Sequence, residues 1–124
     1  MNLYQEQLMD HYKHPRHRGT LEHADFNTQI YNPSCGDGIA FYGRVQDNKV
    51  VELKFMGSGC VISQATASLL TEHSLGKSLE DIEKFDKDFI LALIGMELGP
   101  MRIKCALLPL EAVQEGIKNY RSIK

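Results

Sequence analysis

The sequence lacks a long apolar run, an excess of basic charge and an even set of cysteines. No run approaches the about 20 apolar residues that a membrane-spanning helix needs. A net charge of −2 gives no general attraction to nucleic acid or to an anionic membrane. Three cysteines cannot all pair, so a disulfide framework is not expected. Residues 1–6 have neither the basic nor the apolar segment of a secretory signal. We therefore expect a cytoplasmic protein whose reduced thiols are available for metal or sulfur chemistry.

Common catalytic motifs are absent as well. The chain carries no Ser/His/Asp arrangement, no phosphate-binding loop and no dinucleotide-binding fingerprint, which argues against a conventional small-molecule enzyme. Its 124 residues are 43% hydrophobic and 24% charged, which is ordinary for a globular protein with one two-layer core. We expect a single domain over residues 1–124.

Residues 25–56 have the pattern of a three-stranded antiparallel meander. The predicted strands cover residues 28–31, 39–45 and 50–56, with a turn at residues 47–48. Because adjacent antiparallel strands reverse twice, the third strand returns to the end of the sheet where the first connection lies. The apolar positions expected to face the core in the third strand are Val51, Leu53 and Phe55.

Helices are predicted before and after these strands in the sequence. Apolar residues at helical spacing indicate helices over residues 2–13, 61–75 and 86–95, and Ser78 begins a short helix toward Lys84. In the last helix the core face comprises Leu110, Val113, Ile117 and Tyr120. The expected fold is α+β, with a three-stranded antiparallel sheet packed against several helices in two layers.

The first connection of the sheet, residues 32–38, reads Asn-Pro-Ser-Cys-Gly-Asp-Gly. Cys35 and Asp37 lie two residues apart, so in extended chain their side chains point the same way. The glycines allow a tight turn and leave room for a ligand to approach. A soft thiolate beside a hard carboxylate suits a borderline metal such as zinc or iron.

Two further cysteines are expected to join this pair. The third strand delivers Cys60 to the same end of the sheet and to a helix start, where the macrodipole favours a thiolate. Cys105 is expected at or just before the start of the last helix, with Pro109 in its first turn or at a kink. Cys35, Asp37, Cys60 and Cys105 make a four-ligand set that fits one tetrahedral zinc or ferrous ion. The same thiols fit a two-iron cluster, which one carboxylate would hold less firmly than a fourth thiolate.

These segments resemble the IscU-type, NifU N-terminal-like iron–sulfur cluster assembly scaffolds. The resemblance covers nearly the whole chain and rests on residues 32–37, on residues 57–63 (Gly-Ser-Gly-Cys-Val-Ile-Ser), and on residues 102–105 (Arg-Ile-Lys-Cys). It implies that the cysteines receive sulfur from a cysteine desulfurase and build a labile 2Fe-2S cluster for transfer to apo-proteins. It also implies an iron donor, a role for Asp37 in keeping the cluster labile, and zinc in the same site.

The chain departs from the IscU branch at two places. Lys104 stands where that branch has histidine, and residues 98–102 (Leu-Gly-Pro-Met-Arg) replace the Leu-Pro-Pro-Val-Lys segment that a dedicated Hsp70-type chaperone reads. We therefore expect no dependence on that chaperone. Both features are similar to the SufU branch, yet the spacing of 105 − 60 = 45 positions is short and IscU-like.

Lys104 is a candidate catalytic cation because a protonated amine beside Cys105 favours the thiolate form. Cys105 is then the expected first sulfur acceptor. The alternative is that Lys104 is simply a solvated residue near a helix start.

Three functions are compatible with the ligand set. The first is a cluster assembly scaffold, and the second is a SufU-like, zinc-dependent sulfur acceptor. The third is a structural zinc module that binds a partner without chemistry. Asp37 argues against the third, because structural zinc sites are usually built from cysteine and histidine alone.

Overall fold

The computed structural model describes residues 3–33 and 36–123, which form one three-stranded antiparallel sheet and five helices. The strands follow each other along the sheet in chain order, β1-β2-β3, so the predicted meander is confirmed. The elements are α1 (Leu3–Lys13), β1 (Phe26–Asn32), β2 (Asp37–Gln46), β3 (Lys49–Ser58), α2 (Val61–Ser74), α3 (Leu79–Glu83), α4 (Lys87–Ile94) and α5 (Pro100–Ser122).

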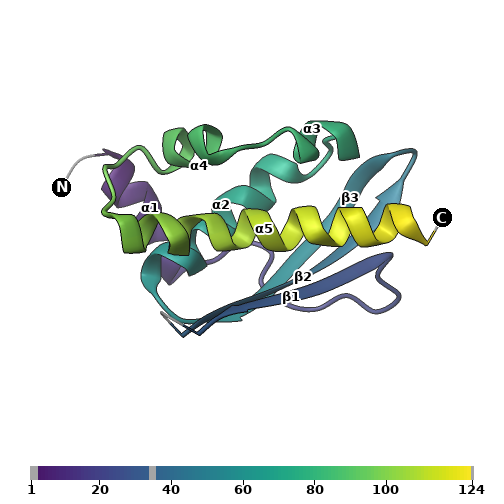
Figure 1. The fold of residues 1–124 in the computed structure, drawn as a ribbon, viewed down its shortest axis with the longest axis horizontal. Helices are drawn as coiled ribbons and strands as arrows, with labels where there is room; N and C mark the ends of the chain where they lie inside the picture. The colour runs from purple at the N-terminus through teal and green to yellow at the C-terminus, as the bar shows by residue number, and fades with distance from the viewer. Residues whose placement is uncertain (1–2, 34–35, 124) are drawn as a thin grey trace.

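The helices cover one face of the sheet, as the α+β prediction requires. In Figure 1, α5 runs lengthwise above β1 and β2, and α2 lies beside it. Helix α1 packs on α2 at one end, while α3 and α4 lie on the side of α5 away from the sheet. The core between sheet and helices contains fully buried side chains from both layers, including Ile39, Phe41, Phe55, Leu70 and Ile117. In the part of the chain that the structure describes, no helix combines the length and apolar character needed to cross a membrane.

The turn between β2 and β3 is the predicted one. Asp47 and Asn48 both have positive φ, 54° and 64°, which is the backbone of a two-residue hairpin turn whose twist matches that of the strands.

Strand β3 contains a bulge at Val51. Arg44 pairs with Glu52 but Val45 pairs with Val50, so Val51 is an extra residue in β3. The predicted inward position of Val51 is therefore wrong: Val51 is 43% exposed and Val50 is buried in its place.

The short helices begin at side-chain caps, in agreement with the sequence. The Ser78 hydroxyl accepts a hydrogen bond from the Asp81 amide at 3.1 Å, and the Asp86 carboxylate accepts one from the Phe89 amide at 2.9 Å. Helix α4 ends at Gly95, which has a φ of 70°. Each cap satisfies an amide that the first turn of a helix leaves without a partner.

Helix α5 begins earlier than its sequence pattern suggested. Gly99 is the N-cap in extended conformation and Pro100 is the first helical residue, where the missing proline N–H costs nothing. Cys105 lies five residues inside the helix and Pro109 lies in its interior, so the prediction that the helix starts at about Cys105 is wrong. The Gly-Pro pair marks the start of the helix, because proline disrupts a helix only beyond its first turn.

Candidate functional site

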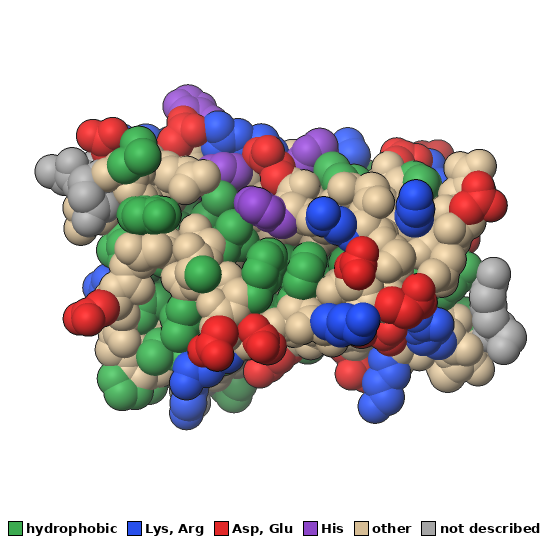
Figure 2. Space-filling view, turned by 90° about the horizontal axis from the view of Figure 1, so that it is seen from above, with side chains coloured by type: hydrophobic (Ala, Val, Ile, Leu, Met, Phe, Trp, Pro, Cys, Tyr) green, Lys and Arg blue, Asp and Glu red, His purple; other side chains and the backbone are tan. Residues whose placement is uncertain are grey.

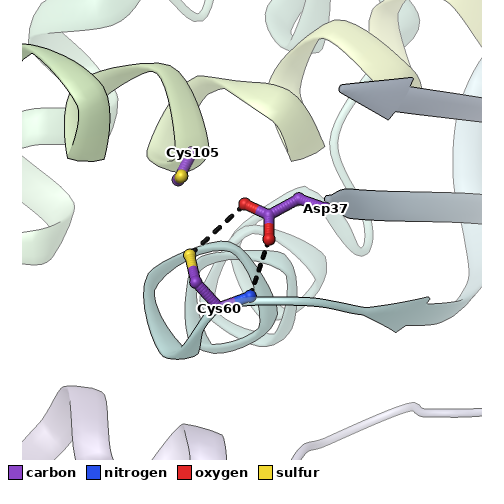
Figure 3. A group of neighbouring side chains, drawn as sticks. All are labelled: Asp37, Cys60 and Cys105. Carbon is purple, nitrogen blue, oxygen red and sulfur yellow. Dashed lines mark hydrogen bonds between the residues drawn. The ribbon is translucent and has the colours of Figure 1, made fainter. Parts of the chain in front are cut away.

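Asp37 and Cys60 meet at the end of the sheet where β2 begins and β3 ends. Asp37 is completely buried, and its two carboxylate oxygens accept hydrogen bonds from the Cys60 amide at 2.6 Å and the Cys60 thiol at 3.3 Å. Figure 3 shows both bonds and the Cys105 sulfur facing them from α5. The sequence-based expectation that β3 returns Cys60 to the start of β2 is confirmed.

Gly59 makes this close approach possible. It has a φ of 126°, and a Cβ at this position would lie 2.0 Å from Asp37 Oδ1. No side chain fits there, so the residue before Cys60 must be glycine for the carboxylate to reach the Cys60 amide.

Cys60 is the N-cap of α2, as predicted. Its sulfur accepts a hydrogen bond from the Ser63 amide at 3.5 Å, and the Ser63 hydroxyl donates to the Cys60 carbonyl at 3.2 Å. The amide and the positive end of the helix macrodipole both stabilise negative charge on this sulfur. Cys60 is half-buried and lines a cavity at this end of the molecule.

Cys105 is the third described member of this group, and it faces Asp37 and Cys60 from α5. It is buried, and its sulfur lies with the Asp37 carboxylate and the Cys60 sulfur in a cluster whose ligand atoms are all within 4.8 Å of one another. The three side chains come from β2, the start of α2 and the second turn of α5. Cys35, the remaining predicted ligand, lies outside the described residues.

The donor set fits a thiophilic divalent metal. Two thiolates and a carboxylate this close together repel one another unless a cation or protons separate them, and they match the ligands of zinc and iron sites. A proton between the Cys60 sulfur and the Asp37 carboxylate, which lie 3.3 Å apart, would relieve part of this repulsion. Cys60 and Cys105 thus occupy positions compatible with their predicted role, and Asp37 lies between them.

A cavity of about 730 Å³ opens beside the two thiols. Figure 2 shows most of the exposed hydrophobic side chains in the half of the molecule that holds the N-terminus, with charged side chains at both ends. The cavity is mostly apolar, with three methionines on its wall. Its lining residues are Gln5, Leu8, Met9, Gly59, Cys60, Val61, Ile62, Met96, Met101, Arg102 and Cys105.

Lys104 is not part of this cavity. It is exposed and lines a separate hollow of about 300 Å³ with Tyr31 and Leu107. Arg102 does line the cavity of about 730 Å³ beside Cys60 and Cys105, although the sequence analysis did not identify it as a candidate. A signal was available: with Pro100 as the first helical residue, Arg102 and Cys105 are three apart on one side of a helix.

A second feature missed from sequence is a polar contact that holds α1 against α2. His11 is buried, and its Nδ1 lies 2.7 Å from the Ser68 hydroxyl, which also accepts from the Arg16 amide at 2.9 Å. Burial lowers the pKa of His11 below its usual 6.5, and the nearby Arg16 charge lowers it further. The contact fixes the helix that supplies one wall of the cavity.

Comparison with known proteins agrees with this architecture. The family model for the NifU-like N terminal domain matches residues 3–124. The chain is 33% identical over 118 residues to the iron–sulfur cluster assembly scaffold protein IscU 1 of Archaeoglobus fulgidus, covering 95% of this chain and 76% of that protein. It is 36% identical to the zinc-dependent sulfurtransferase SufU of Bacillus subtilis, covering 93% of this chain and 89% of that protein.

A solved structure has the same fold. The crystal structure of a putative iron–sulfur cluster assembly scaffold protein for the SUF system from Fervidobacterium islandicum superposes with a TM-score of 0.75 at 30% identity. The superposition covers 90% of this chain and 94% of that chain. With the family model matching almost every residue, the chain belongs to the NifU-like N terminal domain family, within its IscU/SufU-type scaffolds.

Proposed function

We propose that this protein is an iron–sulfur cluster assembly scaffold, on which a labile 2Fe-2S cluster is built as cargo and passed to apo-proteins. The observation that carries the proposal is the group of Asp37, Cys60 and Cys105, with ligand atoms within 4.8 Å of one another and with Asp37 and Cys105 buried. Cys35 lies two residues before Asp37 and supplies the fourth ligand in this proposal. The cluster is labile because one of its four ligands is a carboxylate, a poorer partner for iron than a thiolate.

Sulfur reaches the site from a cysteine desulfurase in this proposal, with Cys105 as the first acceptor. The Cys105 thiolate attacks the outer sulfur of the donor's persulfide, and a new S–S bond forms as the donor's S–S bond breaks. The electron pair leaves with the donor's thiolate, so a sulfur atom moves without net oxidation. An iron donor and recipient apo-proteins complete the set of partners, and we place the reaction in the reducing cytoplasm, where these thiols stay reduced.

The second candidate is a zinc-dependent sulfurtransferase. The observation favouring it is the 36% identity to a relative with that name. Zinc would be held by Cys35, Asp37, Cys60 and Cys105, where it would keep the thiols deprotonated. The same residues would serve both functions. The two candidates differ in what the protein passes on: a sulfur atom carried on a cysteine for the sulfurtransferase, and a finished cluster for the scaffold.

Anaerobic reconstitution separates the two candidates. The purified protein is first analysed for metal and then incubated with ferrous iron, cysteine and a cysteine desulfurase while its visible absorption is recorded. A scaffold develops the absorption of a 2Fe-2S cluster, which an apo-acceptor then removes. A sulfurtransferase retains stoichiometric zinc, develops no cluster absorption and accumulates persulfide that mass spectrometry detects.

A further inference from the structure

Arg102 is the cation that shares a cavity with the two described thiols. It lies in the first turn of α5, three residues before Cys105, and residues at this spacing lie on one side of a helix. Among the residues that line the cavity of about 730 Å³, Arg102 is the one lysine or arginine. Lys104 lines a different hollow, so it is less well placed to act on an anion beside Cys60 and Cys105.

Arg102 is also the arginine whose charge has no partner among the described residues. The first turn of α5 holds no acidic side chain, and among residues 3–33 and 36–123 no side-chain hydrogen bond or ion pair involves the Arg102 guanidinium. A positive charge near a helix N-terminus opposes the macrodipole, so helix stability does not explain it. The remaining arginines all have partners: Arg16 with Asp10, Arg18 with the Gly57 carbonyl, Arg44 with Glu52, and Arg121 with Glu80 and Glu83.

The surroundings of Arg102 strengthen its attraction for an anion. Leu8, Met9 and Met96 give the cavity an apolar wall, and charges interact more strongly beside apolar surface than in open water. A guanidinium keeps its charge throughout the physiological range and presents several N–H donors at once.

We propose that Arg102 binds the anionic outer sulfur of an incoming persulfide and holds it beside the accepting thiol. This inference rests on the proposed sulfur transfer and adds the residue that recognises the donor. Both reactants are negatively charged when a thiolate attacks a persulfide anion, so they repel each other as they approach. The Arg102 charge offsets this repulsion while the S–S bond forms at Cys105 and the donor's S–S bond breaks.

Two alkylating agents of nearly equal size test the charge directly. Iodoacetate is an anion and iodoacetamide is neutral, so the ratio of their rates at one cysteine reports the local positive potential independently of intrinsic thiol reactivity. The measurement uses the full chain, reduced and treated with a chelator, and needs neither a desulfurase nor a cluster. Its result is therefore independent of whether the proposed function is right.

The sequence allows each cysteine to be monitored separately. Cleavage after lysine and arginine places Cys35 in residues 19–44, Cys60 in residues 55–77 and Cys105 in residues 105–118. We expect Arg102→Gln to lower the iodoacetate-to-iodoacetamide ratio at Cys60 and Cys105 by about two- to fivefold, the range of one exposed charge. Arg102→Lys should retain most of the ratio, and Lys118→Gln, at an exposed position on the same helix, should leave it unchanged.

Polysulfide then tests sulfur transfer itself. The Cys105 thiolate takes one sulfur from tetrasulfide dianion and releases trisulfide dianion, so charge and atoms balance. Arg102→Gln should slow persulfide formation at Cys105 by a similar factor at low salt, with the difference shrinking at high salt because ions screen the attraction. Circular dichroism shows whether each variant is folded.

Three results would overturn the proposal. One is that neither alkylation rate changes in folded Arg102→Gln. Another is an equal fall in both alkylation rates, which would mean that Arg102 acts on the thiols and not on the donor. The third is a larger loss of polysulfide reactivity in Lys104→Gln than in Arg102→Gln, which would favour the cation predicted from sequence.

Discussion

The carboxylate of Asp37 accepts two hydrogen bonds from Cys60, one from its amide at 2.6 Å and one from its thiol at 3.3 Å. Asp37 is the first residue of β2 and Cys60 caps α2, so the pair joins the end of the sheet to the start of the helix. A candidate metal ligand is thereby also a structural acceptor. Substitutions of Asp37 must separate these two roles.

Replacing Asp37 with alanine should slow transfer of an assembled cluster to an acceptor by on the order of tenfold, because the labile oxygen ligand is gone. The same change leaves the Cys60 amide without its acceptor and should cost about 1–3 kcal/mol of stability. Asp37→Asn is the matched variant, since its amide oxygen can still accept the Cys60 N–H. Transfer is followed by circular dichroism of the cluster as it reaches an apo-acceptor. If both variants transfer as fast as the parent, Asp37 does not control lability.

Gly59→Ala should destabilise the protein and weaken metal binding together. The new Cβ would lie 2.0 Å from Asp37 Oδ1 at a φ of 126°, so the backbone must move and the carboxylate with it. We expect a loss of about 2–4 kcal/mol. Gly99→Ala is the control, because its Cβ would meet open space at a negative φ. Equal unfolding midpoints in urea for the two variants would contradict the proposed need for glycine at residue 59.

Much of the fold is predictable because the signals are local. Alternation predicts the strands, the Asp47-Asn48 pair predicts the turn, and Ser78 and Asp86 predict helix starts through a side chain that caps a nearby amide. The bulge at Val51 is not predictable in this way. It is a property of how β2 and β3 pair, and that pairing involves residues outside the strand that carries the pattern.

The candidate site is predictable in its ligands but not in its surroundings. Asp37 and Cys60 are identified by residue type and by the end of the sheet that each reaches, and Cys105 is identified by residue type and by its nearness to a helix start. The cavity wall depends on how α1 packs against α2 and on where α5 begins, and both are tertiary facts. Arg102 was missed because the helix was expected to start after it, although Pro100 marks the true start.

Serine substitutions test the metal site ligand by ligand. Cys35→Ser, Cys60→Ser and Cys105→Ser should each lower the affinity for zinc or ferrous iron, by at least about tenfold, since a hydroxyl is a much poorer ligand than a thiolate. Metal analysis and competition with a coloured chelator measure the effect. Unchanged stoichiometry and affinity in all three variants would rule out the site.

Removing the metal should also lower stability. A ligand that binds only the folded state stabilises it by about 2.7 kcal/mol when present at 100 times its dissociation constant. Addition of a chelator should therefore lower the melting temperature of the parent protein and have little further effect on Cys60→Ser. If neither chelator nor added zinc changes the melting temperature of the parent protein, the folded state does not bind metal.

His11 should make stability depend on pH below neutrality. Its pKa is lowered in the folded protein, first by burial and then by the Arg16 charge, while Glu72 opposes the shift. The unfolded chain therefore binds a proton on His11 more readily than the folded chain. This contribution to stability is complete above the usual pKa of 6.5 and is lost as pH falls below it, with a slope of up to about 1.4 kcal/mol per pH unit.

The window from pH 6.5 down to about pH 5.5 isolates this histidine from the shifted carboxyl groups. The pKa values of Asp10 and Glu80 are lowered from 3.8 and 4.5, so the stability that those groups contribute begins to fall only about one pH unit above these values and below. Urea unfolding of the parent and of His11→Gln across this window measures the slope. Glutamine keeps a polar group facing Ser68 but does not titrate, so His11→Gln should show a flatter profile than the parent. Identical slopes would mean that His11 protonates equally well in the folded protein, and that its burial between α1 and α2 does not control stability below neutral pH.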